Sequence, residues 1–198
     1  MKFLFDLDGT ITSQETLPII ARLGGVSDAI DELTRQTIQG NVPFIESFIQ
    51  RVTILKDVSV SKVSESLAEV PLYSHVMSFI RSHTQDCAVV TGNLSCWCDR
   101  LFLKIGCPSF SSEALVENDK VTKIVSILRK ETVVDYFKSQ GETVTFVGDG
   151  NNDLEAMRHA DISIAAGLTH KPARSLYSIT NYMVFNEIAL CRLLNQLS

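Results

Sequence analysis

Four aspartates stand directly after predicted strands, where carboxylates are well placed to do chemistry. Asp6 and Asp8 follow a short apolar run at the start of the chain, and Asp149 and Asp153 follow another run far along it. Ligand sites in open α/β sheets form beyond the carboxyl ends of strands, so these acids are expected to meet at one edge of a sheet. Clustered carboxylates repel one another unless a cation lies among them, and an all-oxygen ligand set favours Mg²⁺. The structural alternative makes Asp6 and Asp149 helix N-caps and the other two solvated loop acids.

Two neighbouring carboxylates also suit covalent phosphoryl transfer. One can attack phosphorus to form an aspartyl-phosphate, and a second can protonate the leaving oxygen and then activate water. The phosphate needs cationic and hydrogen-bonding groups. Thr91 is predicted to end a strand before Gly92 and Asn93, so its hydroxyl and the next N–H groups can bind phosphate at a helix start. Lys130 is predicted to begin a helix, where its charge opposes the helix dipole; a solvated surface lysine is the alternative.

Strands and helices alternate in a pattern that can position these residues. Apolar runs predict buried strands at 2–6, 87–90, 143–147 and 162–165, and helical patterns occupy 95–105, 130–140 and 152–160. This alternation predicts an α/β fold, a Rossmann-like and mostly parallel sheet with helices on both faces. Residues 113–124, which pivot on Asn118 and Asp119, are predicted as a small hairpin.

Residues 13–71 interrupt that alternation. Their apolar side chains follow helical spacing in four stretches, separated by Gly24-Gly25, Gly40 and Asp57 and ended by Pro71. We therefore expect a small cap of four helices, residues 13–71, inserted after the first strand of a core that comprises residues 1–12 and 72–198.

Composition limits the function classes. The chain has 198 residues, 45% of them hydrophobic, and a net charge of −5, which gives no general attraction to nucleic acid or anionic membranes. No apolar run approaches the ~18 residues of a membrane span, and the first residues do not resemble a signal peptide. Five cysteines do not suit a disulfide framework, so we expect a cytoplasmic protein. The expected partner is a small phosphorylated molecule, with no nucleic acid and no membrane. The four histidines are scattered, and only His159 falls beside an acidic motif, where we expect it on the outer helix surface.

Four ordered motifs resemble those of the haloacid dehalogenase (HAD) superfamily of phosphatases: Phe5–Thr10, Val89–Asn93, Lys130 and Val147–Asp153. The resemblance implies an HAD-like core with Asp6 as nucleophile and Asp8 as general acid/base. It further implies phosphate binding by Thr91, Gly92 and Lys130, with Asn152 near the substrate phosphate. Mg²⁺ would be held by Asp6, the backbone carbonyl of Asp8 and Asp149, with Asp153 supporting these ligands.

The helical insertion resembles that of the phosphoserine phosphatase branch, whose members belong to serine biosynthesis. In that branch a cap glutamate and a cap arginine bind the substrate's amine and carboxylate; Glu15 and Arg51 match them, and Phe44 would pack beside the ligand. From the residues alone, Arg51 interrupts an apolar helical stripe and needs an anionic partner, unless its head extends to water. The structural alternative for Glu15 is a capping box with Thr12 at the start of a helix.

The substrate is less defined than the chemistry. Asn93 stands where the branch usually has a second glycine, and its side chain would narrow the pocket or contact the ligand. Phosphoserine is therefore the leading substrate, and a homoserine phosphate or another small phosphorylated intermediate is the alternative. A phosphotransferase or mutase would use the same intermediate, and a signalling receiver domain also pairs an acidic cluster with Thr and Lys. The receiver pattern lacks a four-helix insertion.

Overall fold

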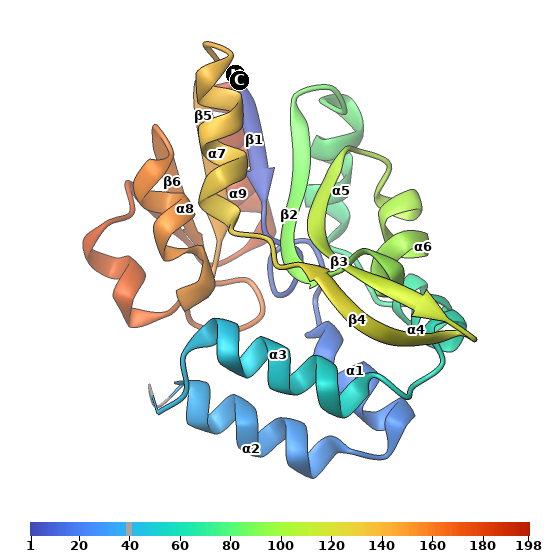
Figure 1. The fold of residues 1–198 in the computed structure, drawn as a ribbon. Coiled ribbons are helices and arrows are strands. Elements are labelled where there is room, and N and C mark those ends of the chain that lie inside the picture. Colours follow the sequence, from blue (N-terminus) through green and yellow to red (C-terminus); the bar gives the residue numbers. More distant parts are fainter. Residues whose placement is uncertain (39–40) are drawn as a thin grey trace.

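A seven-stranded sheet forms the centre of the protein (Figure 1). The computed structural model describes residues 1–38 and 41–198, and the side chains of these residues except 37, 38 and 44. The sheet order is β4-β3-β2-β1-β5-β6-β7; β3 and β4 are antiparallel and every other neighbouring pair is parallel. The strands are β1 (Lys2–Phe5), β2 (Cys87–Leu94), β3 (Ser109–Glu117), β4 (Lys120–Ser126), β5 (Val144–Gly148), β6 (Ile162–Ala166) and β7 (Tyr182–Val184). The predicted α/β class is confirmed.

Helices cover both faces of the sheet (Figure 1). Side chains alternate between the faces of a strand, so Phe3 and Phe5 of β1 belong to one core cluster and Leu4 to the other. The first cluster contains residues of α5 (Ser74–Ser82), α6 (Ser95–Ile105) and α9 (Glu187–Leu197), and the second contains residues of α7 (Lys130–Ser139) and α8 (Leu154–His159). Because both faces are buried, the central strands are mostly apolar.

The insertion after β1 contains four helices, as predicted. They are α1 (Thr16–Gly24), α2 (Ser27–Ile38), α3 (Phe44–Leu55) and α4 (Val60–Ala68). The first three pack on one another beyond the carboxyl end of β1, whereas α4 packs chiefly against α6 (Figure 1). We propose that residues 13–71 form a cap on a core of residues 1–12 and 72–198, with α4 as the part that contacts the core.

Several local details differ from the sequence-based prediction. β2 continues to Leu94, whereas the strand was expected to end at Thr91; the next helix spans Ser95–Ile105, as predicted. The helix expected from residue 152 begins with a 3₁₀ turn, η1 (Asn151–Asp153). The sequence analysis did not identify α5, α9, β7 or the 3₁₀ turn η2 (Arg174–Ser178) as elements. The predicted hairpin is present as β3 and β4, with φ angles of 51° at Asn118 and 64° at Asp119.

None of the helices within the described ranges combines the length and apolar character that crossing a membrane requires.

Candidate active site

The loops after β1 and β5 lie against each other at the carboxyl edge of the sheet. β1 and β5 are parallel neighbours, with Phe5 opposite Val147, so both strands end at the same edge. Gly9 has a φ of 70°, and a Cβ at this position would overlap the Asp149 carboxylate. Only glycine combines this backbone conformation with so close an approach. Gly9 and Asp149, which are separated by 140 positions in the chain, are therefore in close contact.

Lys130 lies buried between two of the acids. Its Nζ is 2.5 Å from Asp6 Oδ1 and 2.6 Å from Asp153 Oδ1, and its side chain is 3% exposed. The surface-lysine alternative is therefore wrong. The other oxygen of Asp153 accepts hydrogen bonds from the backbone N–H groups of Asp149 and Gly150, at 3.0 and 2.9 Å. Lys130 thus fixes the nucleophile candidate from one side, and Asp153 orders the loop after β5.

The buried carboxylates exceed the buried positive charge. Asp6, Asp149 and Asp153 each place an oxygen within 4.8 Å of the others, and Lys130 is the lysine paired with them. Burial and the charge of Asp153 raise the pKa of Asp149 to about 7, and the same causes raise the pKa of Asp6. Excess negative charge, an all-oxygen donor set and burial together suit a divalent cation. Neither Asp6 nor Asp149 makes a side-chain bond to a helix N-terminus among the hydrogen bonds of the described residues, so the N-cap alternative finds no support.

Asp8 is held by the first turn of α1. Its Oδ1 accepts a hydrogen bond of 2.7 Å from the backbone N–H of Thr16. Burial, followed by the charge of Glu15, raises the pKa of Asp8 to about 6. A carboxyl with a pKa close to neutral is suited to donate and then accept a proton.

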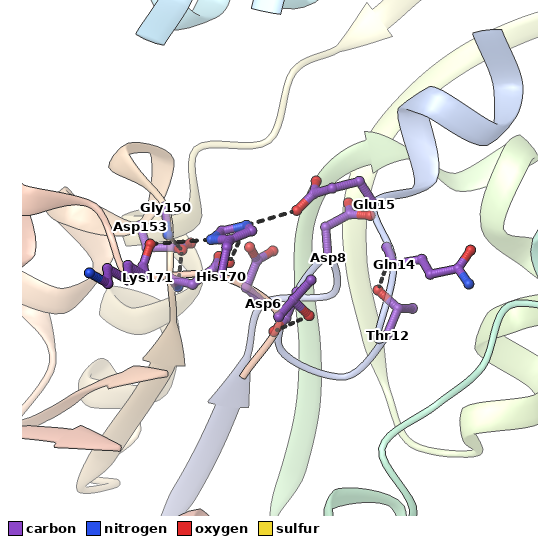
Figure 2. Close-up of polar contacts among 12 residues, drawn as sticks. Asp6, Asp8, Thr12, Gln14, Glu15, Gly150, Asp153, His170 and Lys171 are labelled. Atoms are coloured by element: carbon purple, nitrogen blue, oxygen red, sulfur yellow. Dashed lines mark hydrogen bonds and ion pairs between the residues drawn. The ribbon is translucent and has the colours of Figure 1, made fainter. Parts of the chain in front are cut away.

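Glu15 does not form the capping box with Thr12. It occupies the N-cap position of α1 without a capping side-chain bond, and the Thr12 hydroxyl donates to the carbonyls of Leu7 and Gln14 instead. The Glu15 side chain is 45% exposed and extends beside Asp8 (Figure 2). It is therefore free of a structural role in the helix cap.

The segment Thr91–Asn93 is buried at the end of β2. The Thr91 oxygen accepts a hydrogen bond of 3.2 Å from the Asn93 N–H, which leaves its O–H to donate to a ligand. The Asn93 side chain donates to the Thr16 hydroxyl at 2.7 Å and accepts from the Leu94 N–H at 2.9 Å. Asn93 therefore joins the core to the residue that holds Asp8, while Gly92 accepts a bond from Ser112 through its carbonyl.

Arg51 is buried and forms no ion pair within the part of the chain that the structure describes. Its exposed fraction is 7%, one nitrogen donates to Thr34 at 3.3 Å, and Nε has no hydrogen-bond partner among the described residues. The solvent-extended alternative is therefore wrong. Burial lowers the pKa of Arg51, and the charge of Glu15 acts in the opposite direction, so the two groups are close enough to interact. The Phe44 side chain lies outside the described residues.

His170 is the site residue that the sequence analysis missed. Its Nε2 lies 3.1 Å from Glu15 Oε1 and 3.2 Å from Asp149 Oδ2. The hydrogen bond to Glu15 and the nearby charge of Asp149 raise the pKa of His170 to about 9. The one sequence feature that points to His170 is its position shortly after the strand predicted at residues 162–165. His159 lies on the outer surface as expected, paired with Asp135 at 2.8 Å.

The family model for haloacid dehalogenase-like hydrolases matches residues 3–161 of this chain. The chain belongs to this family. The resemblance inferred from the four motifs is confirmed, and the receiver-domain alternative is set aside. Within this HAD-like hydrolase, the amide oxygen of Asn152 lies over Gly150, where a Cβ would overlap it.

Curated relatives and solved structures agree with this assignment. A phosphoserine phosphatase of Archaeoglobus fulgidus is 29% identical over 175 residues, which cover 82% of this chain and 51% of the relative. The chain thus spans about half the length of that protein. A phosphoserine phosphatase of Methanocaldococcus jannaschii is 27% identical, with coverage of 82% and 83%. A substrate-bound phosphoserine phosphatase structure is similar in fold, with a TM-score of 0.82, 24% identity and coverage of 99% and 98%.

Proposed function

We propose that this HAD-like hydrolase is a phosphatase for small phosphomonoesters, with phosphoserine as the leading substrate. The observation that most supports this proposal is the position of the Asp6 carboxylate, whose Oδ1 is fixed by Lys130 and by the Leu7 N–H at 2.8 Å. Asp8, two residues along the chain, has a pKa raised to about 6. The second Asp6 oxygen is the one we assign to attack on phosphorus. The relatives named phosphoserine phosphatases support the same substrate class.

The reaction has two steps on these residues. Asp6 attacks phosphorus and the ester P–O bond breaks, while Asp8 gives its proton to the leaving alcohol oxygen. Asp8 then takes a proton from water as the water oxygen attacks phosphorus; the P–O bond to Asp6 breaks, which releases inorganic phosphate and restores the Asp6 carboxylate. Thr91, Gly92 and Lys130 would hold the phosphate oxygens, with Asn152 nearby.

Mg²⁺ is the cofactor that we propose. Asp6, the backbone carbonyl of Asp8 and Asp149 would hold it, and Asp153, whose oxygens are already hydrogen-bonded, would support that arrangement. When bound, the ion would neutralise charge on the phosphate oxygens. Lys130 keeps Asp6 in place through the same network.

Arg51 and Glu15 favour an amino-acid phosphate within this class. A buried guanidinium with a free Nε offers a binding position for a carboxylate, and Glu15 offers one for an ammonium group. We also propose a cytoplasmic location, which the five free thiols support because disulfides persist mainly in oxidising compartments.

A screen of phosphorylated metabolites with and without Mg²⁺ tests the proposal. Phosphoserine should lead the panel, and activity should disappear on chelation. Asp6→Asn should abolish turnover while leaving the fold intact by circular dichroism. Turnover of Asp6→Asn near the wild-type rate would remove Asp6 as nucleophile, and a different leading ester, such as a homoserine phosphate, would replace phosphoserine as the substrate.

A further inference from the structure

We propose that His170 is a specificity-determining residue that competes with the substrate's ammonium group for Glu15. The inference rests on the proposed function, in which Glu15 binds the amine of an amino-acid phosphate. Figure 2 shows His170 in contact with Glu15.

The contact joins the proposed cap to the core. Glu15 precedes α1, whereas His170 lies in the loop that follows β6, 155 positions along the chain. Both side chains are about half exposed, at 45% and 48%, so a ligand can reach the contact. The Nε2 atom of His170 faces carboxylates from both sides, Glu15 at 3.1 Å and Asp149 at 3.2 Å.

The loop that carries His170 is fixed by hydrogen bonds to both acidic loops. The Thr169 hydroxyl donates to the Gly9 carbonyl at 3.3 Å, and the Ala173 N–H donates to the Asp149 carbonyl at 2.8 Å. His170 is therefore presented to Glu15 by backbone that is anchored at either end of the segment.

Competition follows from the chemistry of the donors. The imidazole N–H and a substrate ammonium group are both hydrogen-bond donors, and Oε1 of Glu15 already accepts from His170. A substrate ammonium group must therefore share Glu15 Oε1 with His170, or displace His170 from it, to form its own hydrogen bond to Glu15. A substrate without an amine does not meet this competition, so His170 lowers the preference for amines without acting on the phosphate ester itself.

The test compares two substrates in the same enzyme preparation: O-phospho-L-serine and its deamino analogue, 3-(phosphonooxy)propanoate. The analogue keeps the phosphate and carboxylate and lacks only the amine. In His170→Ala, the ratio of kcat/KM for phosphoserine to that for the analogue should rise ~2–5-fold, the range for a partly exposed ion pair. The ratio is independent of the active fraction of the preparation, so reduced folding yield does not affect it.

Two further variants serve as controls for this measurement. In a Glu15→Gln background, His170→Ala should raise the ratio less, because the uncharged amide oxygen binds both competing donors more weakly than a carboxylate does. His159→Ala, which also removes a histidine paired with a carboxylate, should leave the ratio unchanged in the wild-type background.

Three outcomes would overturn the inference. A ratio that is unchanged or lower in His170→Ala contradicts competition, and so does an equal rise in the Glu15→Gln background. A wild-type enzyme that hydrolyses neither substrate but cleaves other phosphate esters would overturn the proposed substrate class together with this inference.

Discussion

The metal-free protein is expected to lose stability as the pH rises from 6 to 8. Burial and the charge of Asp153 raise the pKa of Asp149 to about 7 from an ordinary value of 3.8. In the unfolded chain this carboxyl is already ionised throughout the pH range. The folded state therefore binds more protons than the unfolded state at pH 6, and the free energy of unfolding must fall as the pH rises.

The contribution of the Asp149 carboxyl to the fall in the free energy of unfolding can be worked out from its two pKa values. With folded and unfolded pKa values of about 7 and 3.8, linkage gives a loss of about 1.4 kcal/mol between pH 6 and pH 8. His170, whose pKa is raised to about 9 by the hydrogen bond to Glu15, adds a loss of the same sign. The proposed Mg²⁺ would bind the ionised carboxylates, so a concentration ~100 times its Kd should add about 2.7 kcal/mol to the free energy of unfolding.

Urea unfolding followed by tryptophan fluorescence measures this directly, because Trp97 is the single tryptophan and is fully buried. Titrations at pH 6 and pH 8 would be run with EDTA and repeated with Mg²⁺. Asp149→Asn is the control, and its fall in the free energy of unfolding should be smaller than that of the wild type by about 1.4 kcal/mol, the contribution of this carboxyl. A free energy of unfolding that stays constant or rises from pH 6 to pH 8 in EDTA would refute the reasoning, as would an Asp149→Asn variant with the full fall.

Three substitutions test the remaining assignments. Asp8→Asn should slow hydrolysis of the phosphoenzyme ~10²–10⁴-fold, so the phosphorylated protein accumulates and is seen by intact mass; an unchanged dephosphorylation rate would exclude the acid/base role. Arg51→Ala should lower kcat/KM for phosphoserine ~10–100-fold and affect an aryl phosphate little, whereas equal losses for both would show that Arg51 does not bind a carboxylate. Asn93→Ala removes the buried bond to Thr16 and should cost about 1–3 kcal/mol in urea unfolding, and a wild-type midpoint would show that this bond contributes nothing.

Much of the architecture was accessible from the sequence because it depends on local periodicity. The apolar runs that became β1, β5 and β6 are buried on both faces, and the four helical stretches of the insertion carry regular apolar spacing. Parallel strands end at the same edge of their sheet, so strand assignment alone predicted that Asp6 and Asp149 lie at one edge, and the pairing of β1 with β5 makes them neighbours there. α5 carries the buried pattern Val76, Met77, Phe79 and Ile80, which was available but not recognised as a helix.

The partners of individual side chains were decided only by the tertiary structure. Lys130 could be assigned to a helix start from sequence, but its burial between Asp6 and Asp153 depends on how α7 packs against β2 and β5. His170 gave no periodic pattern, because it lies in an irregular loop whose path is set by hydrogen bonds to residues distant in the chain. Local spacing determines which elements form and at which strand end a polar residue lies. Loop conformation and charge pairing depend on neighbours that only folding brings together, and these placed His170 between Glu15 and Asp149.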